Sequence, residues 1–136
     1  MNVKHILIIA SIMLLLDLSF LYLNKNMFDE QVLKIQDRPI KLNYVAAGLC
    51  YVSMVLGLYY FIIRTKKPVL DAVILGFVIF SVYELTNMSL LDRWDIKTVI
   101  VYSIWGSILF GLTTYLFYYV AAHNTHDFSS IHPASI

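Results

Sequence analysis

The chain of 136 residues is 60% apolar and has a net charge of +1, with a mean hydropathy of +0.72. Soluble domains are about 45–50% apolar, so this composition argues against a soluble protein. The near-neutral charge also argues against nucleic-acid binding through a basic surface, and a single cysteine, Cys50, excludes an internal disulfide.

The apolar residues form four long runs, which predict membrane-spanning helices at about residues 6–23, 44–63, 69–91 and 98–122. At ~1.5 Å per residue, each run crosses most of a ~30 Å hydrocarbon core. The first run follows Lys4 and resembles a signal peptide. It continues past Asp17 without a convincing small-residue cleavage site, so we expect a retained first span.

The first two runs are joined by a polar connection at 24–43, in which Met27, Phe28, Val32 and Ile35 recur at roughly helical spacing. This pattern predicts either an extension of the first helix or a short surface helix. We expect Arg38-Pro39 to end it.

The remaining connections are short. Residues 64–68 form a tight basic turn, which predicts that spans two and three are antiparallel neighbours. Residues 92–95 form a polar turn with an interfacial tryptophan, Trp94, and a polar tail follows at 123–136. The prediction is therefore an all-α polytopic membrane protein: one domain over 1–136, folded as an antiparallel four-helix transmembrane bundle with both termini on one side. Four basic residues on that side against six on the other leave the orientation open.

Small residues at four-residue spacing predict close contacts between the spans. These residues are Ser103, Ser107 and Gly111 on span four, Ala72 and Gly76 on span three, and Ser53 and Gly57 on span two.

Several polar groups are predicted to lie at one depth, roughly 10 Å below the surface that carries residues 24–43. This intramembrane polar layer contains Asp17, Tyr51, Tyr83, Glu84, Asn87 and Trp105, with Cys50 at the same depth. An ionisable residue at membrane depth usually faces the interior of a bundle or a cavity. The spans contain no Lys, Arg or His to neutralise the two acids. Three roles follow: hydrogen bonding across the bundle in the protonated form, binding of protons or a cation, and recognition of a lipid or partner.

A metal site in the tail, at His123, His126, Asp127 and His132, is less favoured than a solvated tail, because no scaffold holds these side chains together. No phosphate loop, nucleophile elbow or paired-cysteine site occurs in the sequence. We therefore expect no enzyme activity, no metal and no cofactor.

The motifs resemble a mostly bacterial family of small four-span membrane proteins, domain of unknown function twenty-one seventy-seven, over about residues 6–121. The resemblance rests on Asp17 with Phe20, on Arg38-Pro39, on Tyr83-Glu84-Leu85-Thr86-Asn87, on Trp94 and on Trp105-Gly106. It implies the fold and no activity.

The chain departs from the family pattern at two positions. Glu84 stands where the family has Asp, and Tyr102 stands where it tends to carry a third acid before Trp-Gly. The composition is also rich in Ile, Lys, Asn and Tyr. Relatives are encoded by large DNA viruses, which makes a virus one candidate source.

The functional hypothesis is a non-enzymatic structural or assembly component of a membrane, with protein partners or a second copy of itself, and with the internal membrane of a virion as one candidate location. The alternative is a small proton- or cation-linked transporter that uses Asp17 and Glu84.

Overall fold

The computed structural model describes residues 2–38 and 41–123, and the secondary structure in these ranges is helical. The helices are α1 (Val3–Leu23), α2 (Lys25–Gln36), α3 (Tyr44–Leu58), η1 (Tyr59–Ile63), α4 (Val69–Leu90) and α5 (Ile96–His123). The connection between the first two spans therefore contains a separate helix, α2. The tail residues 124–136, including His126, Asp127 and His132, lie outside the described part of the chain.

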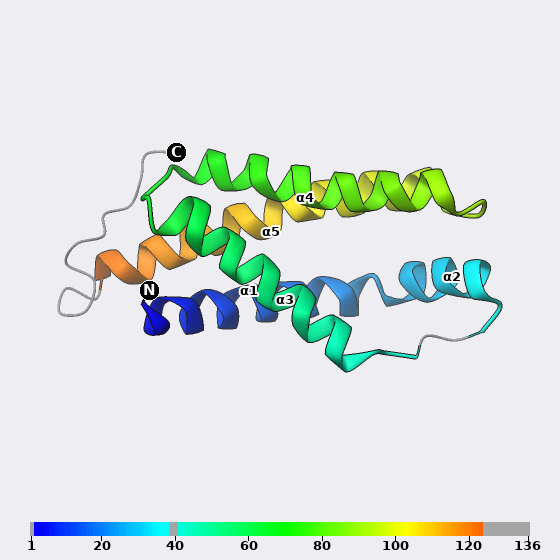
Figure 1. The fold of residues 1–136 in the computed structure, drawn as a ribbon, viewed down its shortest axis with the longest axis horizontal. Helices are drawn as coiled ribbons and strands as arrows, with labels where there is room; N and C mark the ends of the chain where they lie inside the picture. Colours follow the sequence, from blue (N-terminus) through cyan, green and yellow to red (C-terminus); the bar gives the residue numbers. More distant parts are fainter. Residues whose placement is uncertain (1, 39–40, 124–136) are drawn as a thin grey trace.

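Four segments are long and apolar enough to cross a membrane: Val3–Leu23, Tyr44–Ile63, Val69–Leu90 and Ile96–His123. They confirm the predicted all-α fold with four candidate spans, and their ends differ from the predicted ones by only a few residues. The spans alternate in direction, and the start of α1 and the end of α5 lie at the same end of the molecule (Figure 1).

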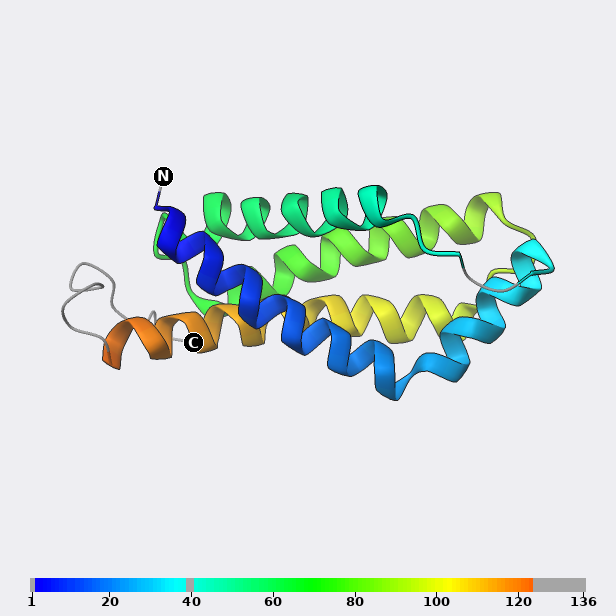
Figure 2. The ribbon, with the colours of Figure 1, turned by 90° about the horizontal axis from the view of Figure 1, so that it is seen from below.

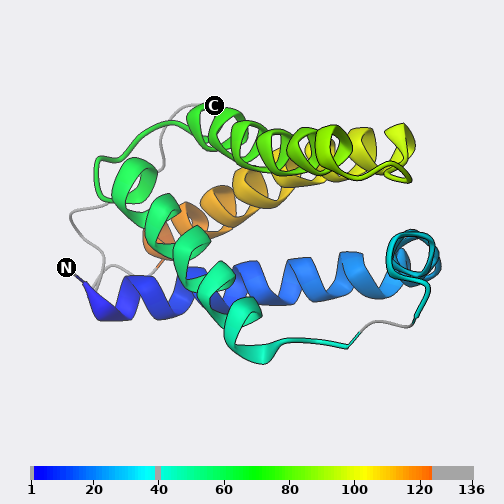
Figure 3. The ribbon, with the colours of Figure 1, turned by 45° about the vertical axis from the view of Figure 1, so that its right-hand side comes forward.

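The most extensive helix contact joins α4 to α5, which run side by side for most of their length (Figures 1 and 3). Glycine makes this close approach possible. A Cβ atom at Gly76 would overlap the backbone carbonyl of Gly106, and one at Gly111 would lie 2.6 Å from Cγ2 of Val73. Ala72 is fully buried on the same side of α4. Backbones separated by so little space gain dispersion contacts that larger side chains would prevent.

On span two, small residues do not have this role. Ser53 is exposed, and a Cβ atom at Gly57 would meet nothing within 4 Å. The expectation that these two residues mark a helix contact is therefore wrong within the described part of the chain. α3 packs instead against α1, which in turn crosses α5 obliquely (Figure 2).

Span two ends in a π-helical turn and a tightly held connection. The amide of Arg64 donates to the carbonyl of Tyr59, a bond that reaches back five residues. Lys66 then adopts a left-handed backbone conformation with φ of 54°, and the Tyr118 hydroxyl donates to the carbonyl of Lys67 at 2.6 Å. The basic turn is thus fastened to α5 as well as to α3 and α4.

The alternating topology predicts which positions are accessible from the same face of a membrane. On a Cys50→Ser background, cysteines at Lys67 and Ala122 should react with an impermeant thiol reagent from one face, and cysteines at Glu30 and Asp92 from the other. Intact vesicles and vesicles opened with detergent provide the comparison. Labelling of positions 67 and 92 from the same face would contradict the fold.

Candidate functional site

Asp17 joins three spans inside the apolar bundle. Its side chain leaves α1 and accepts hydrogen bonds from the hydroxyl of Tyr51 on α3 and from the indole N–H of Trp105 on α5, the latter at 2.9 Å. Each donor binds a different carboxylate oxygen. With little water to compete at this depth, these bonds offset part of the cost of placing a carboxyl group among apolar side chains.

Aromatic packing fixes the direction of the Trp105 donor. The ring of Phe20, one turn beyond Asp17 on α1, stacks on Trp105 with centroids 4.2 Å apart and planes within 3°. Phe20 also meets the ring of Tyr102 edge to face at 5.6 Å. Asp17 and Phe20 therefore act together on the same face of α1, one accepting from the indole and the other packing on its ring.

Glu84 lies in a second polar contact, near the far end of α4. The residue is 3% exposed, and its carboxyl accepts a hydrogen bond from the indole N–H of Trp94 at 2.9 Å. Trp94 belongs to the turn between α4 and α5, so the turn folds its indole back toward the helix that precedes it. The contact fastens this end of the α4–α5 hairpin.

Tyr102 is a buried residue of α5, three positions before Trp105. Its hydroxyl is buried without a hydrogen-bond partner in the described part of the chain, and so is that of its neighbour Ser103. Position 102 is where the family resemblance implies a third acid. In this chain, the position supplies an aromatic ring that packs on Phe20 and Phe28.

Three other positions at this depth have different surroundings. Tyr83 is 60% exposed on the outer face of α4, so it does not share the inward orientation of Glu84, its neighbour in sequence. Asn87 is half-buried one turn from Glu84, and Cys50 is exposed on α3.

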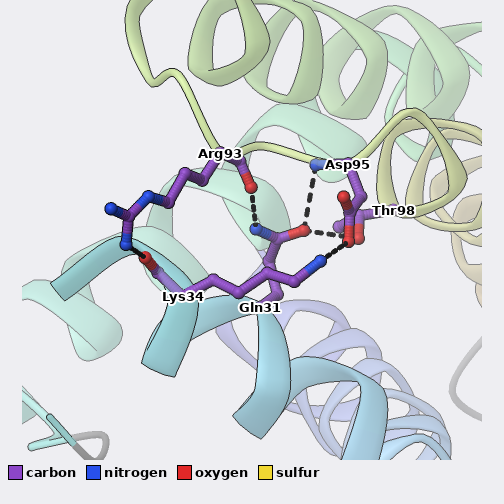
Figure 4. A network of polar contacts seen from close by, with 5 residues as sticks. All are labelled: Gln31, Lys34, Arg93, Asp95 and Thr98. Carbon is purple, nitrogen blue, oxygen red and sulfur yellow. Dashed lines mark hydrogen bonds and ion pairs between the residues drawn. The ribbon is translucent and has the colours of Figure 1, made fainter. Parts of the chain in front are cut away.

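Sequence reasoning missed a second polar centre, in which α2 binds the turn between α4 and α5 (Figure 4). Gln31 is 2% exposed, and its amide serves three groups. Its Nε2 donates to the carbonyl of Arg93 at 3.0 Å, while its Oε1 accepts from the amide of Asp95 at 3.1 Å and from the Thr98 hydroxyl at 2.9 Å. This one side chain therefore satisfies a donor and an acceptor of the turn and a buried hydroxyl in the first turn of α5.

Charged groups surround this amide at the surface. Lys34 pairs with Asp95 at 2.8 Å, and Arg93 donates to the carbonyl of Lys34 at 3.1 Å and lies 3.5 Å from the carboxylate of Asp37. Exposed ion pairs contribute little to stability, so the buried amide of Gln31 is the stronger tie. The sequence did contain a signal: position 31 falls on the same helical face as Met27, Phe28 and Ile35, so a polar residue interrupts the apolar stripe.

In the described ranges, no group of three or more His, Cys, Asp or Glu side chains gathers to hold a metal. His123, the described member of the histidine motif, stacks on Tyr119 with ring centroids 4.2 Å apart.

Comparison with known proteins agrees with the resemblance seen in the motifs. The family described as "Predicted membrane protein (DUF2177)" matches residues 2–119. No curated protein and no solved structure matches the chain.

The Asp17 contacts predict a measurable coupling between α1 and α5. Trp105→Phe keeps an aromatic ring against Phe20 but removes the donor to Asp17. It should destabilise the protein by about 0.6 kcal/mol and at most about 1.7 kcal/mol, the average and the maximum for polar contacts between membrane helices. Unfolding in mixed micelles measures the change. In an Asp17→Leu background the same substitution should cost less, and equal costs in both backgrounds would contradict the coupling.

Glu84 should tolerate loss of its acidity better than loss of its acceptor. Glu84→Gln keeps an oxygen for the Trp94 indole, whereas Glu84→Leu leaves that donor without its partner. We expect a smaller loss of thermal stability for Gln than for Leu. A Leu variant as stable as the Gln variant would show that the hydrogen bond is dispensable.

The amide of Gln31 predicts a third effect. Gln31→Leu leaves the Thr98 hydroxyl and the Asp95 amide without their acceptor, so it should destabilise the protein by about 1–3 kcal/mol and speed hydrogen exchange at residues 93–98. Gln36→Leu is the matched control, since Gln36 is exposed on the same helix and donates locally to the carbonyl of Arg38. Similar exchange in both variants would argue against the contact.

Proposed function

The chain belongs to the DUF2177 family of predicted membrane proteins, and we propose that it is a non-enzymatic membrane component in which two intramembrane acids hold the helices together. The family match and the four candidate spans make it a multi-pass integral membrane protein. The structural role is the further step that we propose.

One observation carries this proposal: the intramembrane acids bind aromatic donors of the same chain. Asp17 accepts from Tyr51 and Trp105, and Glu84 accepts from Trp94. A carboxyl group that accepts hydrogen bonds from neighbouring helices fastens those helices, and it needs neither an ion nor a substrate to do so. These contacts support the structural reading of the polar layer.

We extend the proposal to a partner, a second copy of the chain in a membrane assembly, with the internal membrane of a virion included among the candidate locations. The support is the outer face of α3. Gly48 has open space where a Cβ atom would be, and Tyr44 and Val45, one turn earlier on the same helix, are exposed beside it. Small residues allow membrane helices to approach closely, as they do between α4 and α5.

A transport role is the second candidate, and Tyr102 favours it. Two adjacent buried hydroxyls, those of Tyr102 and Ser103, have no hydrogen-bond partner in the described part of the chain, and the Tyr102 ring packs on Phe20, one turn from Asp17. Hydroxyl and carboxyl groups in series can relay protons through an apolar region. A relay would also have to connect this layer with both membrane surfaces.

Reconstitution separates the two roles. The full chain is placed in vesicles that contain a pH-sensitive dye, and an ion gradient is applied to wild type, Asp17→Asn and Glu84→Gln. The structural proposal predicts no protein-dependent flux, together with a loss of thermal stability in the variants. Proton or cation flux in the wild type that both substitutions abolish, in proteins that remain folded, would overturn it.

The partner is tested by the oligomeric state in the bilayer. Single-molecule photobleaching of the labelled chain should show pairs, and Gly48→Leu should convert them to monomers because it fills the open face of α3. Ile74→Leu, an exposed change on α4, serves as the control. Monomers in the wild type would contradict the proposed homo-oligomer.

A further inference from the structure

We propose that an anionic phospholipid binds along the outer side of the α4–α5 contact, with an acyl chain in a groove and its phosphate at the basic turn 64–67. This inference is independent of the role of the acids, because the groove residues of α5 begin at Ser107, after Trp105, and the groove lining does not include Asp17 or Glu84.

The groove is an apolar hollow of about 330 Å³. Its lining includes Val69 and Val73 of α4 and, across from them, Ser107, Ile108, Gly111 and Tyr115 of α5. Ser107 and Gly111 follow each other at helical spacing on α5, and the Val73 side chain lies directly against Gly111. Ile108 and Tyr115 are about half exposed and stand beside it.

The dimensions suit one lipid chain. From Ser107 to Tyr115 the helix rises about 12 Å at 1.5 Å per residue. One leaflet of a ~30 Å hydrocarbon core is about 15 Å thick, so the groove covers most of the depth that one acyl chain occupies. Since the groove opens outward from an apolar helix pair, a bilayer lipid reaches it without crossing protein.

The basic turn lies at the surface end of this groove. Arg64, Lys66 and Lys67 precede Val69, which is the first groove residue of α4. The turn is anchored to the helix that forms the opposite wall, because the Tyr118 hydroxyl donates to the carbonyl of Lys67. The Arg64 guanidinium is held by a cation–π contact, 4.1 Å from the centre of the Tyr60 ring.

Charge selects the headgroup. The turn contains three cationic residues, and the first turn of α4 contains one acid, Asp71, so the net charge at this end of the groove is positive. A phosphate diester suits this end of the site, and an acyl chain suits the other. A net-negative lipid such as phosphatidylglycerol is favoured over phosphatidylcholine, whose quaternary amine cancels the phosphate charge.

Native mass spectrometry of the full chain tests the proposal. The protein is purified in detergent and mixed with equimolar phosphatidylglycerol and phosphatidylcholine of the same chain length. We expect the protein to retain one phosphatidylglycerol molecule in preference to phosphatidylcholine. At about fivefold in affinity per cation near an anionic headgroup, Arg64→Gln with Lys67→Gln should reduce the preference by roughly 25-fold. Lys25→Gln with Lys41→Gln removes the same charge outside the turn and should leave it unchanged.

The groove is tested by filling it. Ile108→Trp places a large ring at the wall of the hollow and should displace the lipid. Ile104→Trp is the matched control, since Ile104 is similarly exposed one turn away on α5 and is outside the groove lining. Both positions are exposed to the membrane, so both variants should fold, and their melting temperatures check this.

Three results would overturn the proposal. They are equal retention of the two lipids by wild type, an equal loss of preference in the two charge-removal variants, and equal lipid retention by the two tryptophan variants.

Discussion

A carboxyl group in an apolar interior must find donors, and Asp17 finds them on two other helices. Its bonds to Tyr51 and Trp105 connect α1, α3 and α5 at one depth. Apolar packing alone does not fix the rotation of a membrane helix strongly, because lipid tails are as apolar as leucine. A directional contact does, and Phe20 adds to it by holding the Trp105 ring in place. The arrangement of these three spans therefore depends on this carboxyl group.

The hairpin of α4 and α5 is fastened differently, by glycine contacts along its length and by polar contacts at its end. Gln31 binds Arg93 and Asp95, the residues on either side of Trp94, and the Trp94 indole donates to Glu84. The surface helix α2 and the buried acid are thus connected through one short loop.

The four spans were predictable because long apolar runs have few alternatives in a chain of this composition. The positions of Asp17 and Glu84 inside two of the spans followed from the same runs. The direction in which each side chain points was harder to predict. Tyr83 is next to Glu84 in sequence, but successive residues on a helix point about 100° apart, and Tyr83 faces outward. The partners of Gln31 are more than sixty positions away in the chain, and only the folded arrangement brings them together. Gly57 shows the limit of small-residue patterns, since the same spacing marks a contact on α4 and an open face on α3.

The π-helical turn of span two changes the side of the helix on which its last residues lie. A bond that reaches back five residues rather than four inserts one extra residue into the turn, so the helix falls behind its α-helical phase. Met54, Val55 and Leu58 before the turn are buried, and so are Tyr59, Ile62 and Ile63 within it. The phase lag keeps both sets on one narrow side of the helix. Span two can thus keep its inward face against the bundle up to the membrane surface, where the Tyr59 hydroxyl accepts the amide of Asn2.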